Sequence, residues 1–190
     1  NKRNDDFGGT VEKRCEFMRR VIHGIRSQVP SYFPVLIKFN GGGEKAYVPP
    51  EELAIISKIA QNSGVDAIEI AVDKKLKGSH FSPSVFSGYG KEIKKIAKKS
   101  NYDYTAVALA RKAVKVPIIS TGGHLELHNM KKFVKSGLCD MIGLSRPLIR
   151  EPNLVDMFKN GITQASTCKQ CNGCLNYTSA KENPLKCVNP

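Results

Sequence analysis

The sequence contains no run of apolar residues long enough to cross a lipid bilayer, which requires about 18 to 20 of them. Residues 1–6 are polar and lack the apolar core of a secretory signal peptide. These absences exclude a transmembrane segment within the sequence, and we expect a soluble, cytoplasmic protein. With 190 residues, of which 41% are hydrophobic, the chain is long enough to form one globular unit.

Acidic residues are scarce: 17 Asp and Glu stand against 30 Lys and Arg, which gives a formal net charge of +13. Such an excess is compatible with nucleic acid, an anionic membrane or an acidic small molecule as a partner. In the Lys-rich residues 91–99, lysines alternate with apolar residues, without interleaved aromatic side chains or a nucleic-acid-binding motif. We interpret this stretch as the solvated face of a helix, and nucleic acid is not the favoured partner.

No Gly-x-Gly-x-x-Gly fingerprint follows the first expected strand, which disfavours a dinucleotide-binding Rossmann fold. The remaining pattern is a helix followed by four strand–helix units, which predicts a parallel sheet buried on both faces. The expected helices span residues 11–29, 51–63, 105–114 and 127–136, with a short one after Pro152, and the expected strands span 33–39, 67–72, 116–120 and 141–144. Four such units are half of an eight-fold barrel, and because no initiating Met is present, we expect a piece of a larger barrel.

Glycine-containing turns, 120–123 and 143–147, follow the last two expected strands. Glycine lets backbone N–H groups approach a phosphate closely, and an arginine can pair with its charge. Barrel enzymes commonly bind phosphate with the loops after their last two strands. Together with the opening segment 1–14, these turns resemble the NADH:flavin oxidoreductase (old yellow enzyme) family in their order along the chain.

This resemblance implies a (β/α)8 TIM barrel, of which residues 1–160 supply about the last four βα units, followed by a cysteine-rich segment, 161–190. It also implies residues for the phosphate of FMN, namely Thr121, Gly122, Gly123, Gly143, Ser145 and Arg146. Lys38 takes the place of the basic residue that faces the flavin ring near its N1 and C2 carbonyl, where a cation stabilises the reduced flavin. Most relatives have Arg there. His80 lies in a loop on the substrate side and is a candidate proton donor or substrate contact.

Four of the six cysteines fall near the end of the chain, at Cys168, Cys171, Cys174 and Cys187. This clustering favours metal or iron–sulfur ligation over a disulfide framework, and an iron–sulfur cluster, zinc and unligated thiols all remain open. The segment resembles the 2,4-dienoyl-CoA reductase branch of the family, which implies a [4Fe-4S] cluster and electron transfer between FMN, the cluster and a C-terminal flavin/NAD domain. That branch places three residues between its second and third cysteines, whereas two stand here.

The function implied by the resemblance is hydride transfer from NAD(P)H to FMN and then to an activated alkene, such as an enoate, enone or enoyl thioester. The family's substrate-anchoring residues and proton donor precede residue 1, so we expect this chain alone to bind FMN weakly and to be inactive. Two open sheet edges would favour association with the N-terminal half of the barrel or with a second copy. The alternatives are a basic, zinc-stabilised nucleic-acid-binding module and an inactive fragment of a flavoenzyme.

Overall fold

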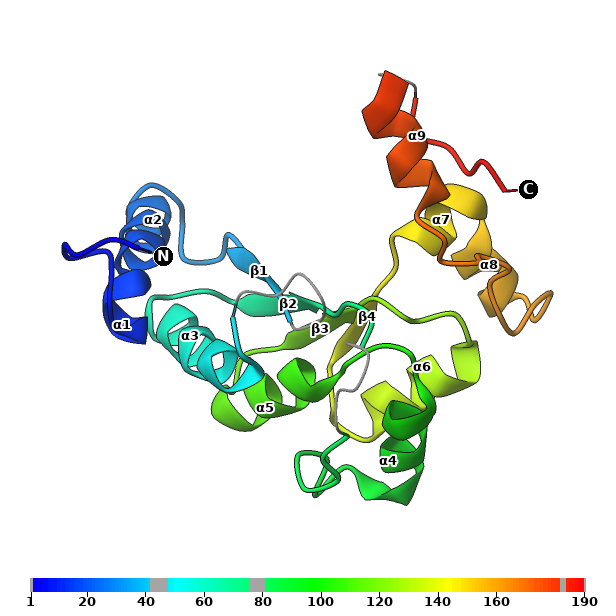
Figure 1. Ribbon diagram of the computed structural model, residues 1–190, viewed down its shortest axis with the longest axis horizontal. Coiled ribbons are helices and arrows are strands. Elements are labelled where there is room, and N and C mark those ends of the chain that lie inside the picture. Colours follow the sequence, from blue (N-terminus) through cyan, green and yellow to red (C-terminus); the bar gives the residue numbers. More distant parts are fainter. Residues whose placement is uncertain (1, 42–47, 76–80, 182–183, 190) are drawn as a thin grey trace.

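The computed structural model describes residues 2–41, 48–75, 81–181 and 184–189. Within them, four parallel strands form a single sheet in chain order (Figure 1). The strands are β1 (Leu36–Asn40), β2 (Ala67–Ala71), β3 (Ile118–Thr121) and β4 (Met141–Gly143). Helices connect consecutive strands, as the alternating sequence pattern predicted.

The helices before and between the strands are α1 (Val11–Arg14), α2 (Glu16–Arg26), α3 (Pro50–Asn62), α4 (Gly90–Lys99), α5 (Thr105–Ala113) and α6 (Leu127–Lys135). Those after the last strand are α7 (Arg146–Arg150), α8 (Leu154–Lys159) and α9 (Gly173–Lys181). The expected first helix is divided at Cys15, which ends α1 and precedes α2. α7 and α9 were not predicted from the sequence.

One face of the sheet carries the hydrophobic core. Ile68, Ile70 and Ile118 point to this face and are fully buried. Figure 1 shows α3 and α5 side by side below the sheet, where they pack against each other. Small side chains on α5, including Ala106 and Ala110, allow this close approach and are themselves inaccessible to solvent.

The opposite face of the sheet is only partly covered, in contrast to the expected burial on both faces. Its strand residues lie in rows across the sheet, one of which joins Lys38, Glu69, Ile119 and Met141. At the two edge strands, Leu36 is 52% exposed and Met141 is 47% exposed. In a closed barrel this face is the interior, where side chains of the remaining strands fill the space.

Two equivalent polar clamps hold the beginnings of the strands, at the end of the sheet opposite the glycine-rich turns. In the first, Arg26 pairs with Asp66, whose carboxylate accepts a hydrogen bond of 2.7 Å from the backbone N–H of Val35. Arg26 also donates to the carbonyl of Phe33 over 2.8 Å. Because the backbone groups of residues 33 and 35 bond to these side chains, β1 begins at Leu36 and not at Phe33 as predicted.

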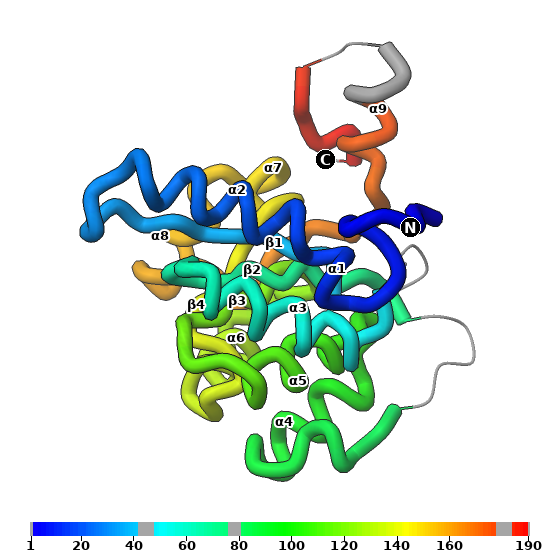
Figure 2. The backbone as a smooth tube through the Cα atoms, turned by 90° about the vertical axis from the view of Figure 1, so that its left-hand side faces the viewer, coloured from blue at the N-terminus to red at the C-terminus, as the bar shows by residue number. Residues whose placement is uncertain are grey.

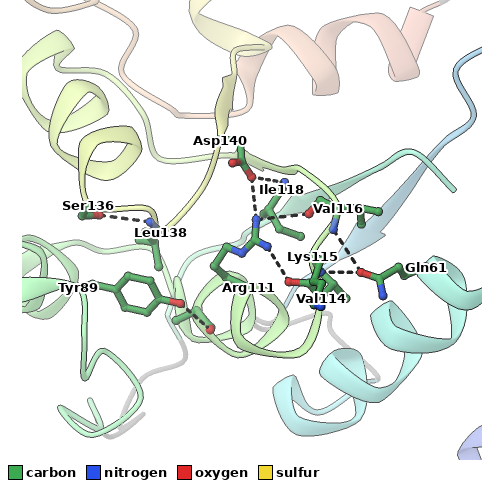
Figure 3. A network of polar contacts seen from close by, with 11 residues as sticks. Gln61, Tyr89, Arg111, Val114, Lys115, Val116, Ile118, Ser136, Leu138 and Asp140 are labelled. Carbon is green, nitrogen blue, oxygen red and sulfur yellow. Dashed lines mark hydrogen bonds and ion pairs between the residues drawn. The ribbon is translucent and has the colours of Figure 1, made fainter.

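The second clamp repeats this arrangement before β3 and β4 (Figure 3). Arg111 pairs with Asp140 over 2.9 Å, and Asp140 accepts the backbone N–H of Ile118 over 2.7 Å. Gln61 adds a further anchor, because its side-chain oxygen accepts the N–H groups of Lys115 and Val116 at 2.6 and 3.2 Å. The clamps leave the opposite ends of the strands available for a binding site.

The cysteine-containing segment extends from the sheet and its helices. Residues 164–166 pair with the turn before α6, through Leu127 N–H to Gln164 O and Ser166 N–H to Leu125 O, both 2.9 Å. Beyond them, α9 and the C-terminal residues project away from the sheet (Figure 2). None of the helices in the described ranges is long and apolar enough to cross a membrane.

Candidate functional site

The carboxyl ends of the four strands meet in one row across the sheet, formed by Asn40, Ala71, Thr121 and Gly143. A cavity of about 180 Å³ opens beside this row. Its lining consists of Lys38, Ala71, Val72, Thr121, Gly122, Gly123, His124, Gly143, Leu144, Ser145, Arg146, Pro147 and Gln170. The fold therefore brings together the six residues expected to hold a phosphate, and Lys38 with them.

Gly122 and Gly123 are required by the backbone of the first turn. Their φ angles of +107° and +73° lie in the left-handed region, which favours glycine. A Cβ atom on Gly122 would lie 2.4 Å from the carbonyl oxygen of Val72, and one on Gly123 would lie 2.6 Å from the ring of Tyr102. The two glycines thus let the turn pack tightly against the neighbouring loops.

Gly143 meets a different constraint in the last strand. A Cβ atom there would lie 1.9 Å from the hydroxyl oxygen of Thr121, its partner in the parallel ladder. Any side chain at Gly143 would displace Thr121 from the wall of the cavity. Thr121 is itself 8% exposed, so little space is available for such a shift.

Several residues in the cavity lining carry backbone hydrogen-bond donors without an acceptor in the described part of the chain. The backbone N–H groups of Gly122, Gly123 and Ser145 donate to no other described residue. The guanidinium of Arg146 adds charge-assisted donors and is held by the hydroxyl of Tyr102, 3.0 Å from Nη2, and by the side-chain oxygen of Asn172. This donor set, with one fixed cation and several free N–H groups, suits a phosphate monoester.

Lys38 lies in the middle of β1 and reaches the same cavity from the open face of the sheet. Its ammonium forms an ion pair of 2.7 Å with Glu69, the residue opposite it on β2. Burial, the largest single effect, disfavours the charged form of Glu69, but the Lys38 ammonium and the Thr121 hydroxyl together outweigh it, and the pKa of Glu69 lies below its usual value. Lys38 therefore presents a cation whose charge is partly compensated within the chain.

His124, which follows the glycine pair, is a buried wall of the cavity and is 4% exposed. Its Nε2 lies 2.9 Å from the hydroxyl of Ser120, and its ring packs edge-on against Phe133 and tilted against Tyr104. Burial lowers the pKa of His124 to about 4, so its imidazole is neutral at physiological pH. A neutral, clamped ring of this kind stiffens the turn and leaves the cation at the site to Arg146 and Lys38.

A larger cavity of about 540 Å³ adjoins the first between α4 and α6, and the two share Gly123, His124 and Gln170. Lys95, Lys99 and Lys132 contribute to its lining. Of the other sites predicted from the sequence, His80 lies outside the described residues. Its expected role on the substrate side therefore stays a prediction.

The four clustered cysteines surround one small cavity of about 20 Å³, which Arg146, Gln170 and Asn172 also line. Gln170 and Asn172, on either side of Cys171, have left-handed φ angles of 52° and 61°. Two donors point at the sulfur of Cys171: the backbone N–H of Gly173 at 3.5 Å and the side-chain amide of Asn189 at 3.0 Å. The Gly173 contact, followed by the Asn189 contact, lowers the pKa of Cys171 despite some desolvation.

Within the ranges that the structure describes, no three cysteine, histidine or carboxylate side chains are arranged closely enough to hold a metal ion. The described thiols are also free of disulfides. Cys15 and Cys139 are buried in the core. The four cysteines thus line one cavity, but their described side chains do not form a coordination shell.

Three residues at this site were not predicted from the sequence. Tyr102 and Asn172 hold Arg146, and Gln170 lines all three cavities. Their roles depend on loop conformations between distant segments, which no local pattern encodes. The only available signal was the position of Gln170 and Asn172 within the cysteine motif itself.

Comparison with known proteins places this geometry in a family. A model of the NADH:flavin oxidoreductase / NADH oxidase family matches residues 1–165. The NADH-dependent flavin oxidoreductase iliE of Hypocrea jecorina is 32% identical over 162 residues, which cover 81% of this chain and 38% of that protein. The bilirubin reductase of Mediterraneibacter gnavus is 28% identical over 204 residues, which cover 99% of this chain and 29% of that protein.

Among solved structures, a complex of 2-naphthoyl-CoA reductase with 2-naphthoyl-CoA superimposes with a TM-score of 0.72 at 25% identity. The match covers 100% of this chain and 28% of that one. The four parallel βα units are thus part of a (β/α)8 TIM barrel, as predicted from the sequence. The chain spans well under half the length of each of these proteins.

Proposed function

The chain belongs to the NADH:flavin oxidoreductase / NADH oxidase family, and from this premise we propose that it supplies the FMN phosphate site of a flavin-dependent oxidoreductase. The full-length protein would take hydride from NAD(P)H and pass it to an acceptor. Bound FMN would supply the redox chemistry, accepting hydride on its ring and releasing it again. The residues of this chain would bind and orient the cofactor.

The observation that carries the proposal is the convergence of donors at the strand ends. Gly122, Gly123 and Ser145 offer backbone N–H groups without an acceptor in the described chain, and Arg146 adds a fixed positive charge. The cavity of about 180 Å³ has room for a phosphate group and leaves the rest of a flavin to extend over the open face of the sheet. Lys38 stands on that face and would favour negative charge on the reduced ring.

The acceptor we propose is an activated alkene, such as an enoate, enone or enoyl thioester. The likeness to 2-naphthoyl-CoA reductase, which extends over 100% of the chain, supports a thioester of this kind. The bilirubin reductase likeness extends over 99% of the chain, so relatives with the same architecture bear the names of chemically different acceptors. The acceptor is therefore the part of the proposal that requires direct measurement.

We further propose that residues 161–190 form a separate cofactor segment after barrel residues 1–160, with a [4Fe-4S] cluster held by Cys168, Cys171, Cys174 and Cys187 and zinc as the alternative. Thiolates suit both metals. The four cysteines line one cavity, and hydrogen bonds to the sulfur of Cys171 favour its thiolate. The family match ends at residue 165, whereas the reductase matches continue through the cysteines, which supports a segment specific to one branch.

Anaerobic purification of the full-length protein tests both parts of the proposal. We expect flavin absorbance that NADH or NADPH bleaches and that an enone or enoyl thioester then restores. About four irons with acid-labile sulfide per chain would support the cluster, and the double variant Cys171→Ala/Cys187→Ala should lose them while Cys15→Ala keeps them.

Zinc in place of iron would leave the proposed oxidoreductase activity standing and would show that the cysteines bind zinc and not an iron–sulfur cluster. A protein without flavin, or a flavin that neither nicotinamide cofactor reduces, would contradict the proposed function. If NADH or NADPH reduces the flavin but no alkene reoxidises it, only the proposed class of acceptor is contradicted.

A further inference from the structure

The arginine expected to pair with the flavin phosphate is held from two sides. Its Nη2 lies 3.0 Å from the hydroxyl of Tyr102, a residue that is 3% exposed and belongs to the loop between α4 and α5. Its Nη1 donates to the side-chain oxygen of Asn172, in the cysteine segment. A guanidinium has five N–H donors, so these two contacts leave donors free for an anion.

The cysteine segment reaches the phosphate cavity by an unusual backbone path. Gln170 and Asn172 have left-handed φ angles, whereas the other positive φ angles in the described chain belong to glycines. For Asn this conformation is tolerated, and for Gln it is strained. The path places Gln170 in the wall of the phosphate cavity and Asn172 on Arg146, with Cys171 between them facing the other cavity.

We propose that Asn172 is a positioning residue for the flavin phosphate: it fixes the guanidinium of Arg146, so that the cysteine segment completes the phosphate site. This inference rests on the proposed function, since it requires FMN at the strand ends. Asn172 does not touch the cofactor in this account. Because Asn172 already holds the Arg146 side chain in place, Arg146 loses less conformational entropy when the phosphate binds.

The same contacts couple the two cofactor sites. A metal or cluster held by the four cysteines would order the loop that carries Asn172, and Arg146 would then be held more firmly. Arg150 strengthens this connection, because it donates to Thr167 over 2.6 Å and lies 3.5 Å from the sulfur of Cys187. By linkage, occupation of the phosphate cavity must favour order in the cysteine loop to the same degree.

Asn172→Gly is the sharpest test, because glycine keeps the left-handed backbone while removing the amide. In flavin-stripped full-length protein, we expect this variant to bind FMN up to about tenfold more weakly, the entropic cost of ordering one long side chain on binding. Its affinity for riboflavin, which lacks the phosphate, should be unchanged. Asn176→Ala, an exposed position one turn further on, is the matched control and should alter neither affinity.

A double-mutant cycle decides whether the effect passes through Arg146. In an Arg146→Ala background, Asn172→Gly should no longer change FMN affinity, because the side chain it positions is gone. Removal of the bound metal should weaken FMN binding, and not riboflavin binding, in the wild type, and should do so far less in Asn172→Gly. Metal content measured on every variant shows that the loop retains its ligands.

The inference is overturned if Asn172→Gly keeps the wild-type FMN affinity, weakens riboflavin equally, or acts undiminished without Arg146. Failure of the proposed function has a different signature, in which the wild-type protein binds neither flavin. The two failures are therefore distinguishable in one set of titrations.

Discussion

At the scale of single residues, the site depends on where a side chain is missing as much as on where one is present. A Cβ atom on Gly143 would overlap the hydroxyl of Thr121, and one on Gly123 would overlap the ring of Tyr102. His124 beside them is buried, neutral and bonded to Ser120. These positions fix the shape of the cavity before any ligand enters, so binding need not order the turn.

Two glycine-to-alanine changes should have opposite effects. Gly24 lies within α2 with no atom near its missing Cβ, so Gly24→Ala should stabilise the protein by about 0.5–1 kcal/mol. Gly143→Ala should destabilise it by about 1–3 kcal/mol and weaken FMN binding, because the new methyl group overlaps Thr121. Urea denaturation and flavin titration measure the two properties. A neutral Gly143→Ala would show that Thr121 moves freely.

His124 should make stability depend on pH in the mildly acidic range. Its folded-state pKa of about 4 lies below the unfolded value of 6.5, so the unfolded chain binds more protons between these values. The contribution of His124 to the free energy of unfolding is thus fully present above pH 6.5. It falls as the pH decreases toward 4, by up to about 3 kcal/mol. The difference in unfolding free energy between wild type and His124→Asn, measured from pH 7 to pH 4, isolates this contribution. A difference that does not vary with pH would contradict the buried neutral imidazole.

At the scale of elements, the structure repeats one device at two strand pairs. An arginine from a helix and an aspartate directly before the next strand together hold the start of the preceding strand, through Arg26 and Asp66 and through Arg111 and Asp140. A Ser-Gly pair stands before each aspartate in the sequence, with one residue between the glycine and Asp66 and two between the glycine and Asp140. Comparing residues 63–68 with 136–142 would have revealed the repeat, which the search for strands and helices alone does not detect.

Loss of either aspartate should destabilise the fold without affecting the proposed flavin site at the other end of the strands. Asp66→Ala leaves the N–H of Val35 without its acceptor, and Asp140→Ala does the same to Ile118, at about 1–3 kcal/mol each. Asp156→Ala, at an exposed position on α8, should change stability by less than about 0.5 kcal/mol. Chemical denaturation measures all three. Equal effects of the three changes would show that the clamps contribute nothing.

The pKa of Asp66 is lowered by the Val35 N–H and then by Arg26. Its stabilising effect is therefore present above the unfolded pKa and is lost as the pH falls through the folded value.

Much of this architecture was accessible from the sequence because periodicity and turn chemistry are local. The alternation of strands with helices predicted a parallel sheet. The glycines at the ends of β3 and β4 contributed to the family resemblance, which implied a barrel with a phosphate site. The contacts of Asn172 and the burial of His124 were not accessible, since they depend on segments that meet only in the fold. The first strand was also misplaced by three residues, because a clamp and not strand propensity sets its start.

At the scale of the whole molecule, the helix-covered face of the sheet is a packed core and the other face is partly open. The open face carries the Lys38–Glu69 ion pair and leads to the cavity proposed for the phosphate. The cysteine segment lies over the same end of the strands and shares Arg146 and Gln170 with that cavity. The chain thus concentrates its candidate cofactor contacts at one end of the sheet, while the clamps stabilise the other.

The most direct test of this account compares FMN with riboflavin, which differ only in the phosphate, as ligands of the flavin-stripped full-length protein. Several charge-assisted and backbone hydrogen bonds to the phosphate predict that FMN binds at least about a hundredfold more tightly, as measured by flavin fluorescence titration. Equal affinities for the two flavins would contradict the assignment of the cavity at Gly122, Gly123, Ser145 and Arg146 as the phosphate site.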